Sequence, residues 1–363
     1  MIKSILCQAV LCHSLMFFYT GSYTQKGAPA VNPHGKGIGC FQFDSEKGTI
    51  TNVNYTSLRN VSYLTVSSDS KYLYAVEELA ETEYPKVYAY QIKEDGNLNL
   101  LNSQKLIGDY ACHLSIVDGR LMVANYGTGN ALSFPILKDG SLGSCEQIIQ
   151  HKGVGPNKER QEAAHAHMVY PFDHNKVFVV DLGLDKATAY VHDASNQWIA
   201  SKAEDISVDP GAGSRHMTMD KTQTYAYLLG ELDGHIYVVK KEKDGFQRVQ
   251  KISFVPRSYH GDFGGAAIRI HPNGKYLYAT CRGANTIAVF SINENTGILS
   301  LVHTISSFGT SPRDFNIDPS GKWLIVANQD SDSLVVFKID SDNGMLEKHE
   351  SFHVDTPVNI SWK

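Results

Sequence analysis

Residues 72–77 read YLYAVE, a short apolar run that ends in a polar residue, and runs of this kind recur along the chain. Six further copies lie at residues 16–22, 121–125, 177–181, 225–231, 276–282 and 323–328. The copies are about 51 residues apart on average, and self-similarity at such a period is the signature of a repeat architecture. This repeat decides the fold class before any single residue is considered.

Further strands accompany each copy of the run. A second apolar strand follows it, a turn containing Gly then leads to a third strand in six of the seven units, and a leading strand precedes the run in every unit except the first. The turn glycines, such as Gly96 and Gly140, suit tight hairpins because glycine adopts a positive φ without steric cost. Each unit is therefore predicted to contain four antiparallel strands.

The two ends of the chain complement each other. The first unit lacks its leading strand, whereas residues 358–362 (VNISW) match the pattern of that strand and have no unit behind them. We therefore predict an all-β, seven-bladed β-propeller in which the C-terminal strand joins the N-terminal blade, because a closed ring leaves no open sheet edge. Residues 16–363 are expected to form a single propeller domain, and residues 1–15 an N-terminal extension.

The N-terminal extension and the cysteines indicate the cellular compartment in which the protein is expected. Residues 1–15 lack the clean apolar centre and the small-residue cleavage site of a secretory signal, which leaves a weak signal peptide and an upstream start codon as open alternatives. The six cysteines show no C-x-x-C pair and no zinc spacing, as expected of thiols in a reducing compartment. We expect a cytoplasmic protein, with export as the alternative if residues 1–15 belong to a signal peptide.

Composition excludes some classes of function. The chain has 33 Lys and Arg against 38 Asp and Glu, a net charge of −5, whereas a general nucleic-acid binder is expected to be basic. No stretch approaches the roughly 18–20 consecutive apolar residues of a membrane-spanning helix. We therefore expect neither a nucleic-acid partner nor a membrane span, and the sequence makes no prediction of oligomeric state.

The antiparallel order predicts which polar residues meet. The start of each leading strand and the end of each following run lie on the same face, so residues far apart in sequence converge on one mouth of the central channel. The starts contain Asn60, His113, His165, His167, Arg215, His216, Gly265 and Arg313. The bends after the runs contain Tyr23, Glu77, Glu78, Asn125, Asp181, Glu231, Arg282, Asn328 and Gln329. Three Arg and several His at one mouth of an acidic protein predict a site for an anionic ligand.

Structural roles compete with this hypothesis. Three of the histidines, His113, His167 and His216, are interpreted as occupying one position of the repeat, which favours packing between blades as much as function, whereas His165 lies two residues outside that register. The Asx residues could cap their bends. Arg282 and Arg313 could form ion pairs between blades, and an inward-pointing Glu231 would need a partner such as Arg215.

Two segments stand out from the repeat. Residues 153–167 form a longer and more polar connection than its equivalents, and residues 259–266 are rich in Gly just before a leading strand. Long loops on one face of a scaffold commonly carry function. We expect both segments to rim the pocket.

Several short motifs resemble the seven-bladed lactonase family of the 6-phosphogluconolactonase type, which also includes carboxymuconate-cyclising enzymes. The matching stretches are YTGSYTQ at 19–25, RQEAAHAH at 160–167, DLGLD at 181–185, PGAGSRH at 210–216, GEL at 230–232, CRG at 281–283, SPRDFNIDP at 311–319 and VANQDSD at 326–332. The resemblance covers residues 16–362. Two positions depart from it: Ser214 stands where the family usually has Pro, and Ala266-Ala267 replaces an Ala-Glu pair.

The resemblance implies a hydrolase that opens a sugar-acid lactone, with 6-phosphogluconolactone as the expected substrate. Carried onto this sequence, the proposed catalytic residues of the family are His165 or His167, Arg215, Glu231 and Arg282. Glu231 or His165 is the expected base, and Arg215 and Arg282 are expected to bind the oxyanion and the phosphate. The remaining expected substrate-binding residues at the mouth are Glu77, Asn125, His216, Arg313, Asn328 and Gln329. No cofactor and no metal are expected.

Three alternatives remain open at this point. A cycloisomerase acting on a muconolactone would use nearly the same cationic mouth. A non-enzymatic ring that binds proteins should spread its polar residues evenly over the rim. A metal-dependent lactonase could hold Ca²⁺ through the side-chain oxygens of Glu77, Asn125, Asp181 and Asn328.

Overall fold

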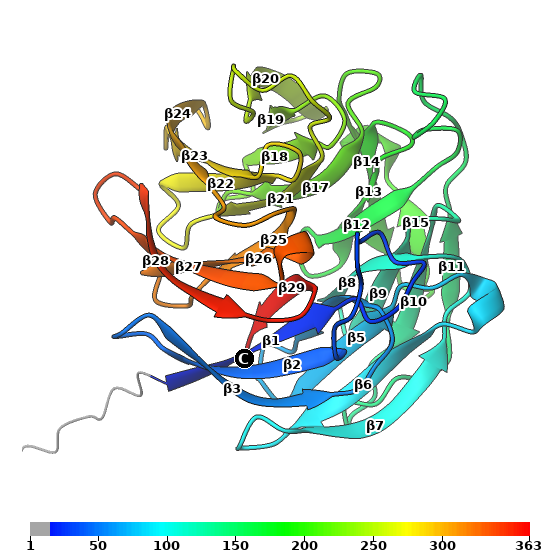
Figure 1. Ribbon diagram of the computed structural model, residues 1–363. Helices are drawn as coiled ribbons and strands as arrows, with labels where there is room; N and C mark the ends of the chain where they lie inside the picture. Colours follow the sequence, from blue (N-terminus) through cyan, green and yellow to red (C-terminus); the bar gives the residue numbers. More distant parts are fainter. Residues whose placement is uncertain (1–14) are drawn as a thin grey trace, which may run out of the picture.

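The computed structural model describes residues 15–363, and Figure 1 shows them as seven antiparallel sheets, the blades, arranged around a common centre. Blade 1 contains β29 (Pro357–Trp362), β1 (Leu15–Ser22), β2 (Ile38–Asp44) and β3 (Thr49–Thr56). Blade 2 contains β4 (Val61–Val66), β5 (Tyr72–Glu77), β6 (Lys86–Ile92) and β7 (Leu98–Lys105). Blade 3 contains β8 (Ala111–Val117), β9 (Arg120–Asn125), β10 (Asn130–Pro135) and β11 (Gln147–Gln150).

The remaining blades repeat this order. Blade 4 contains β12 (Ala166–Pro171), β13 (Lys176–Asp181), β14 (Lys186–His192), β15 (Trp198–Ala200) and the short β16 (Ile206–Ser207). Blade 5 contains β17 (Ser214–Met219), β18 (Tyr225–Gly230), β19 (His235–Glu242) and β20 (Gly245–Ser253). Blade 6 contains β21 (Gly265–Ile270), β22 (Tyr276–Cys281), β23 (Thr286–Ile292) and β24 (Leu299–Ser306). Blade 7 contains β25 (Pro312–Ile317), β26 (Trp323–Asn328), β27 (Ser333–Ile339) and β28 (Leu346–His353). The predicted fold class is confirmed.

Helical structure is limited to connections. Within residues 15–363 the helical segments are three short 3₁₀ turns, η1 (Glu81–Glu83), η2 (Lys202–Glu204) and η3 (Gln329–Ser331), and none has the length or apolar character needed to cross a bilayer. Of the predicted N-terminal extension, residues 1–14 lie outside the described residues, and Leu15 already belongs to β1.

The ring closes as the sequence predicts. The C-terminal strand β29 pairs antiparallel with β1, with Trp362 opposite Phe18 and Ile360 opposite Thr20. The Trp362 ring packs on Phe18 at a centroid distance of 5.1 Å and on Phe43 at 5.4 Å, so that this strand also contributes to the core of blade 1. The first and last segments of the chain therefore stabilise each other within one sheet.

Adjacent blades are held together by apolar side chains and by a recurring tyrosine. Tyr19, Tyr74, Tyr227 and Tyr278 are fully buried, and each hydroxyl donates a hydrogen bond to the carbonyl of the hairpin glycine in the next blade, at 2.9–3.0 Å. The acceptors are Gly96, Gly140, Gly297 and Gly344, all with positive φ. A Cβ at Gly140 would lie 2.2 Å from the Tyr72 ring, so glycine is required both for the turn and for the contact between blades.

Candidate functional site

Each blade has a β-bulge at the start of its innermost strand. From blade 1 to blade 7 the innermost strands are β29, β4, β8, β12, β17, β21 and β25. The pairing of each innermost strand with its neighbour shifts by one residue just after the first residue of that strand. A bulge bends the strand and re-aims one side chain. The re-aimed residues, here called the bulge positions, are Ser62, Cys112, His167, Arg215, Ala266, Arg313 and Val358. His167 therefore shares its position with Cys112 and Arg313, whereas His113 and His216 come one residue later, which corrects the predicted alignment of the three histidines.

A second recurring position follows the second strand of each blade. One residue beyond that strand, the backbone N–H donates to the carbonyl that precedes the innermost strand, at 2.8–3.2 Å in all seven blades. These residues, here called the exit positions, are Tyr23, Glu78, Tyr126, Leu182, Glu231, Arg282 and Gln329. The bulge and exit positions thus place two side chains per blade at the same mouth of the ring.

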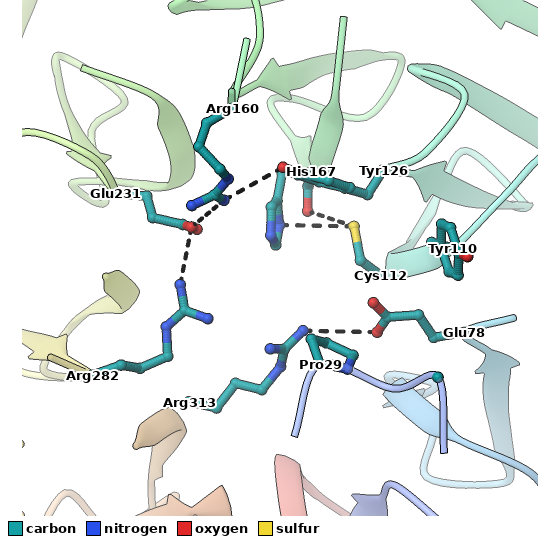
Figure 2. Close-up of a pocket in the computed structure, with 11 residues that line it drawn as sticks. Pro29, Glu78, Tyr110, Cys112, Tyr126, Arg160, His167, Glu231, Arg282 and Arg313 are labelled. Carbon is teal, nitrogen blue, oxygen red and sulfur yellow. Dashed lines mark hydrogen bonds and ion pairs between the residues drawn. The ribbon is translucent and has the colours of Figure 1, made fainter. Parts of the chain in front are cut away.

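A cavity of about 340 Å³ lies at this mouth, and every blade or its connecting loop contributes to the wall. It is lined by Gly27, Pro29, Glu78, Tyr110, Cys112, Tyr126, Arg160, His167, Glu231, Arg282 and Arg313. Figure 2 shows these side chains pointing toward one another around the hollow. Three bulge positions and four exit positions are among them, so the repeat itself explains most of the wall.

The two loops singled out by the sequence widen the site. A second cavity of about 560 Å³ adjoins the first, sharing Pro29, Arg160, Glu231 and Arg282. Its other lining residues are Asn157, Glu159, Leu232 and Gly261, Asp262, Phe263 and Gly264. Residues from the segments 153–167 and 259–266 therefore line the pocket, as the sequence predicts.

Three guanidinium groups surround one carboxylate on the first side of the cavity. Oε1 of Glu231 accepts a hydrogen bond from Arg160 Nη2 at 2.7 Å and lies 3.1 Å from Arg282 Nη2. Oε2 of Glu231 lies 3.0 Å from Arg215 Nε. We call these four residues the Glu231 clamp. The side chain of Arg215 is 3% exposed and lies outside the cavity lining, whereas those of Arg282 and Arg160 are 22% and 43% exposed and reach it.

The clamp fixes the charge of its carboxylate. Burial alone would raise the pKa of Glu231, but the charges of Arg282 and Arg215, together with that of Arg160, hold this pKa far below the ordinary value. Burial and the nearby charge of Arg282 lower the pKa of Arg215 to about 10, which still leaves it protonated at neutral pH. Three cations against one anion leave excess positive charge at this wall, which suits an anionic ligand.

The opposite side of the cavity carries a looser arrangement. The Tyr23 hydroxyl donates a hydrogen bond of 2.5 Å to Oε2 of Glu78, and Arg313 Nη2 lies 3.7 Å from the same oxygen. The Arg313 guanidinium also lies over the Tyr23 ring, 5.2 Å from its centroid. Glu78 is 6% exposed, and its burial raises the pKa of the carboxyl even though Arg313 and Tyr23 act in the opposite direction.

The two candidate histidines have different surroundings. His167 lines the cavity, with Nδ1 3.7 Å from the Cys112 sulfur, and burial lowers the pKa of its imidazole well below the ordinary value. His165 lies behind the lining, where its ring stacks on Tyr126 at 4.4 Å and its Nδ1 is 2.9 Å from the Tyr126 carbonyl. His165 therefore supports Tyr126, and the expectation that it is a base in contact with substrate does not fit its position.

Three predicted substrate-binding residues are turned away from the cavity. Glu77 binds Arg59 at 2.8 and 3.1 Å and accepts the Lys86 N–H. Asn125 donates to Asn130 Oδ1 of its own blade, and Asn328 donates to the carbonyl of Ser307, which directly follows the last strand of blade 6. Each is the last residue of its strand, one residue before an exit position, and successive side chains of a strand point in opposite directions.

Two other predicted residues lie at the edge of the site. Gln329 donates to the Pro29 carbonyl at 2.8 Å and thereby holds the loop between β1 and β2, which is drawn in dark blue in front of β8 and β9 in Figure 1. His216 lies beneath the cavity, its ring 5.5 Å from both His113 and His167. Five of the predicted residues lie together at this mouth, namely Arg215, Glu231, Arg282, Arg313 and His167.

Several lining residues were not assigned a role from the sequence. Tyr126 and Glu78 occupy exit positions, and an alignment of the bends on Glu231 and Arg282 would have selected them. Arg160 opens the RQEAAHAH motif but lies outside the repeat. Gly27 and Pro29 belong to a loop with no equivalent in other blades, so the repeat gives no signal for them.

The oxygen ligands considered for a metal do not converge. Glu77, Asn125 and Asn328 have the partners given above, and Asp181 accepts hydrogen bonds from the His165 and Leu184 N–H groups and contacts His151 at 2.7 Å. Among residues 15–363, no group of three or more His, Cys, Asp or Glu side chains is arranged to hold a metal ion.

Comparison with known proteins gives a consistent picture. Residues 17–362 match the family model described as lactonase, 7-bladed beta-propeller. A 6-phosphogluconolactonase of Bacillus subtilis (strain 168) is 34% identical over 307 residues, covering 83% of this chain and 84% of that protein. A solved structure from Bacteroides fragilis NCTC 9343 superposes with a TM-score of 0.88 at 31% identity, covering 98% of this chain and 99% of that one. The periplasmic gluconolactonase of Pseudomonas aeruginosa gives a TM-score of 0.88 at 27% identity, covering 96% and 99%.

Proposed function

The chain belongs to the seven-bladed β-propeller lactonase family, and from this premise we propose that it is a lactonase that hydrolyses 6-phosphogluconolactone to 6-phosphogluconate. The observation that carries the choice of an anionic lactone is the Glu231 clamp. Two of its three guanidinium groups, those of Arg160 and Arg282, reach a cavity of an otherwise acidic protein, and the third, that of Arg215, lies buried behind them. A phosphate carries nearly two negative charges at neutral pH, and the planar, forked donors of Arg suit its oxygens.

The positions of the arginines suggest how the substrate lies. Arg160 and Arg282 line both the central and the adjoining cavity, which makes the boundary between the two the proposed site of the phosphate. The lactone ring would then lie deeper, among His167, Cys112 and Arg313. In this arrangement Arg313 is the cation nearest the carbonyl oxygen, where it would stabilise the negative charge that develops during attack.

The clamp also assigns Glu231 a role. Both of its oxygens face guanidinium groups, and its pKa is held far below neutrality, so it is poorly suited to accept a proton. We propose instead that Glu231 positions Arg160 and Arg282 for the substrate. His167, neutral at physiological pH, is proposed to make a hydrogen bond to the bound sugar.

The test compares three lactones on the purified full chain, with uncatalysed hydrolysis subtracted. 6-Phosphogluconolactone should be preferred over gluconolactone by at least about tenfold in kcat/KM, since one charge-assisted hydrogen bond is worth roughly 1.5–3 kcal/mol and 1.36 kcal/mol is about tenfold in rate. Equal rates would remove the phosphate from the proposal. Turnover of a carboxymuconolactone alone would assign the cycloisomerase instead.

A further inference from the structure

Glu78 faces the Glu231 clamp across the cavity and is held quite differently. Both carboxylates occupy exit positions, in blades 2 and 5, and both are almost fully buried. Glu231 has three guanidinium partners within 3.1 Å, whereas the cation nearest Glu78, Arg313, lies at 3.7 Å. Figure 2 shows the Glu78 carboxyl directed into the hollow beside Cys112 and Arg313.

The contacts of Glu78 are concentrated on one oxygen. The Tyr23 hydroxyl and the Arg313 guanidinium both approach Oε2, which leaves Oε1 as the oxygen able to accept a proton from water. Tyr23 is fully buried, and burial raises the pKa of its phenol well above the ordinary value. Tyr23 therefore remains a donor and holds the carboxyl in one orientation.

The neighbours of Glu78 come from four other blades. They are Tyr23 of blade 1, Cys112 of blade 3, Arg215 of blade 5 and Arg313 of blade 7, together with Ser62 of its own blade. Burial raises the pKa of the Glu78 carboxyl, and the charges of Arg313 and Arg215 limit this rise. Burial also raises the pKa of the Cys112 thiol, so Cys112 is neutral beside it. Glu78 is thus a carboxyl that can gain and lose a proton nearer neutrality than Glu231 can.

We propose that Glu78 is the general base of the hydrolysis, that Tyr23 is a positioning residue for its carboxylate, and that Arg313 both orients this carboxylate and stabilises the oxyanion. This inference rests on the proposed lactonase function. It replaces the sequence expectation that Glu231 or His165 is the base, because Glu231 is saturated with guanidinium contacts and His165 lies behind Tyr126.

The chemical step balances with water as the sole co-reactant. Oε1 of Glu78 removes one proton from a water molecule as the water oxygen bonds to the lactone carbonyl carbon, and the carbonyl oxygen becomes the oxyanion beside Arg313. The oxyanion then re-forms the carbonyl and the bond from carbon to the ring oxygen breaks. Protonated Glu78 returns its proton to that ring oxygen, which leaves as a hydroxyl group. The new carboxylic acid releases one proton to solvent, and Glu78 is regenerated.

The principal test is Glu78→Gln, which keeps the size of the side chain and removes its basicity. With 6-phosphogluconolactone as substrate, kcat should fall by about 10² to 10⁴-fold, the usual contribution of general acid–base catalysis, while KM changes by less than about threefold. Binding of 6-phosphogluconate, measured by calorimetry, should persist, which reports the fold and the phosphate site independently of turnover. Glu146→Gln is the matched control, since Glu146 pairs with Arg120 on the outer part of blade 3 and should leave kcat unchanged.

The pH profile separates a base from a merely structural residue. Wild-type kcat/KM should fall on the acid side with a midpoint above 4.5, the ordinary pKa of a glutamate, because burial raises the pKa of Glu78. The hydrogen bond from Tyr23 lowers that pKa, so Tyr23→Phe should move the acid limb to higher pH. The same limb should be absent from the residual activity of Glu78→Gln.

The outcomes distinguish this inference from the function on which it rests. A wild-type protein that hydrolyses no lactone refutes the proposed function and the role of Glu78 with it. An active wild type combined with a folded, product-binding Glu78→Gln variant of near-normal kcat overturns the role of Glu78 alone. An acid limb that Tyr23→Phe leaves in place or moves to lower pH would also overturn it. If Glu78→Gln does not fold, Glu78→Asp, which retains a titrating group with shorter reach, must show a reduced kcat with an acid limb still present.

Discussion

Glu78 and Glu231 are the same residue type at the same position of the repeat, yet their surroundings give them opposite properties. Each follows the second strand of its blade, and each donates its backbone N–H to the residue before an innermost strand, both at 2.8 Å. Glu231 meets Arg160, Arg215 and Arg282, and its pKa is lowered. Glu78 meets a tyrosine and one distant arginine, and its pKa is raised.

The difference shows that the neighbouring blades, and not the repeat, set the chemistry of an exit position. A carboxylate bound by several cations stays ionised and serves as an anchor for them. A buried carboxyl with few partners exchanges its proton more readily near neutral pH. In a closed ring the two can face each other across one cavity, which separates substrate binding from proton transfer within a site of about 340 Å³.

The largest expected effect is on stability and concerns Glu231. Glu231→Gln leaves three buried or half-buried guanidinium groups without their anion, and breaking a buried ion pair typically costs about 3–5 kcal/mol. The free energy of unfolding, measured by denaturant titration, should fall by that order. Glu78→Gln should change it much less, because its nearest cation is 3.7 Å away. Equal losses of unfolding free energy in the two variants would show that Glu231 is not held more tightly by its partners than Glu78 is by its own.

The next effect is on catalysis and concerns Arg282. Arg282→Ala removes a forked donor from the edge of the cavity, where a charge-assisted hydrogen bond is worth about 1.5–3 kcal/mol. At 1.36 kcal/mol per factor of ten, kcat/KM for the phosphorylated lactone should fall by about 10 to 200-fold. The control is Arg248→Ala, because Arg248 lies on the outermost strand of blade 5 and pairs with Asp209. A loss of thermal stability with unchanged kcat/KM in the folded enzyme would assign Arg282 to the clamp alone.

The fold is predictable from the sequence because the repeat carries it in every unit. The run at residues 72–77, its six copies and the C-terminal strand each carry an apolar pattern that the strands β1, β5, β9, β13, β18, β22, β26 and β29 reproduce. The hairpin glycines add an independent signal, since they also accept the tyrosine hydroxyls of the preceding blade.

The site is only partly predictable, and the errors have one physical cause. A shift of one residue along a strand reverses the direction of the side chain. The sequence pattern points to Glu231 and Arg282 at the exit position but to Glu77 and Asn125 one residue earlier. Glu77 therefore contacts Arg59 in the segment that leads into its blade, and Asn125 contacts Asn130 of its own blade. The bulges add a second one-residue shift, which misaligned His167 with His113 and His216.

A smaller effect is expected from the loop between β1 and β2, which contributes Gly27 and Pro29 to the lining of the cavity. Gln329→Ala removes the hydrogen bond from Gln329 to the Pro29 carbonyl and the contact of Gln329 with Arg313. A neutral hydrogen bond contributes about 0.5–1.5 kcal/mol, so KM should rise by about 2 to 12-fold. The kcat should change less, because Glu78 and Arg313 stay in place. A lower kcat with an unchanged KM would instead show that Gln329 acts on the catalytic step and not on substrate binding.

The smallest expected effect is on the pH dependence of stability, where the two carboxyls should act with opposite sign. The pKa of Glu231 is lower in the folded protein than in the unfolded chain, so its contribution is present above the unfolded pKa and is lost as the pH falls. The pKa of Glu78 is higher in the folded protein, so the folded state binds the proton more tightly and stability declines as the pH rises from the ordinary carboxyl value to the raised one.

Thermal midpoints of wild type, Glu78→Gln and Glu231→Gln at about pH 4 and pH 7 measure both contributions, because the other titrating groups cancel in each difference. When the pH is raised from about 4 to 7, the thermal midpoint of Glu78→Gln relative to that of wild type should rise, and that of Glu231→Gln should fall. Differences of the same sign for both variants would mean that the two exit positions are electrostatically alike, and the contrast between an anchored and a titrating carboxyl would have to be abandoned.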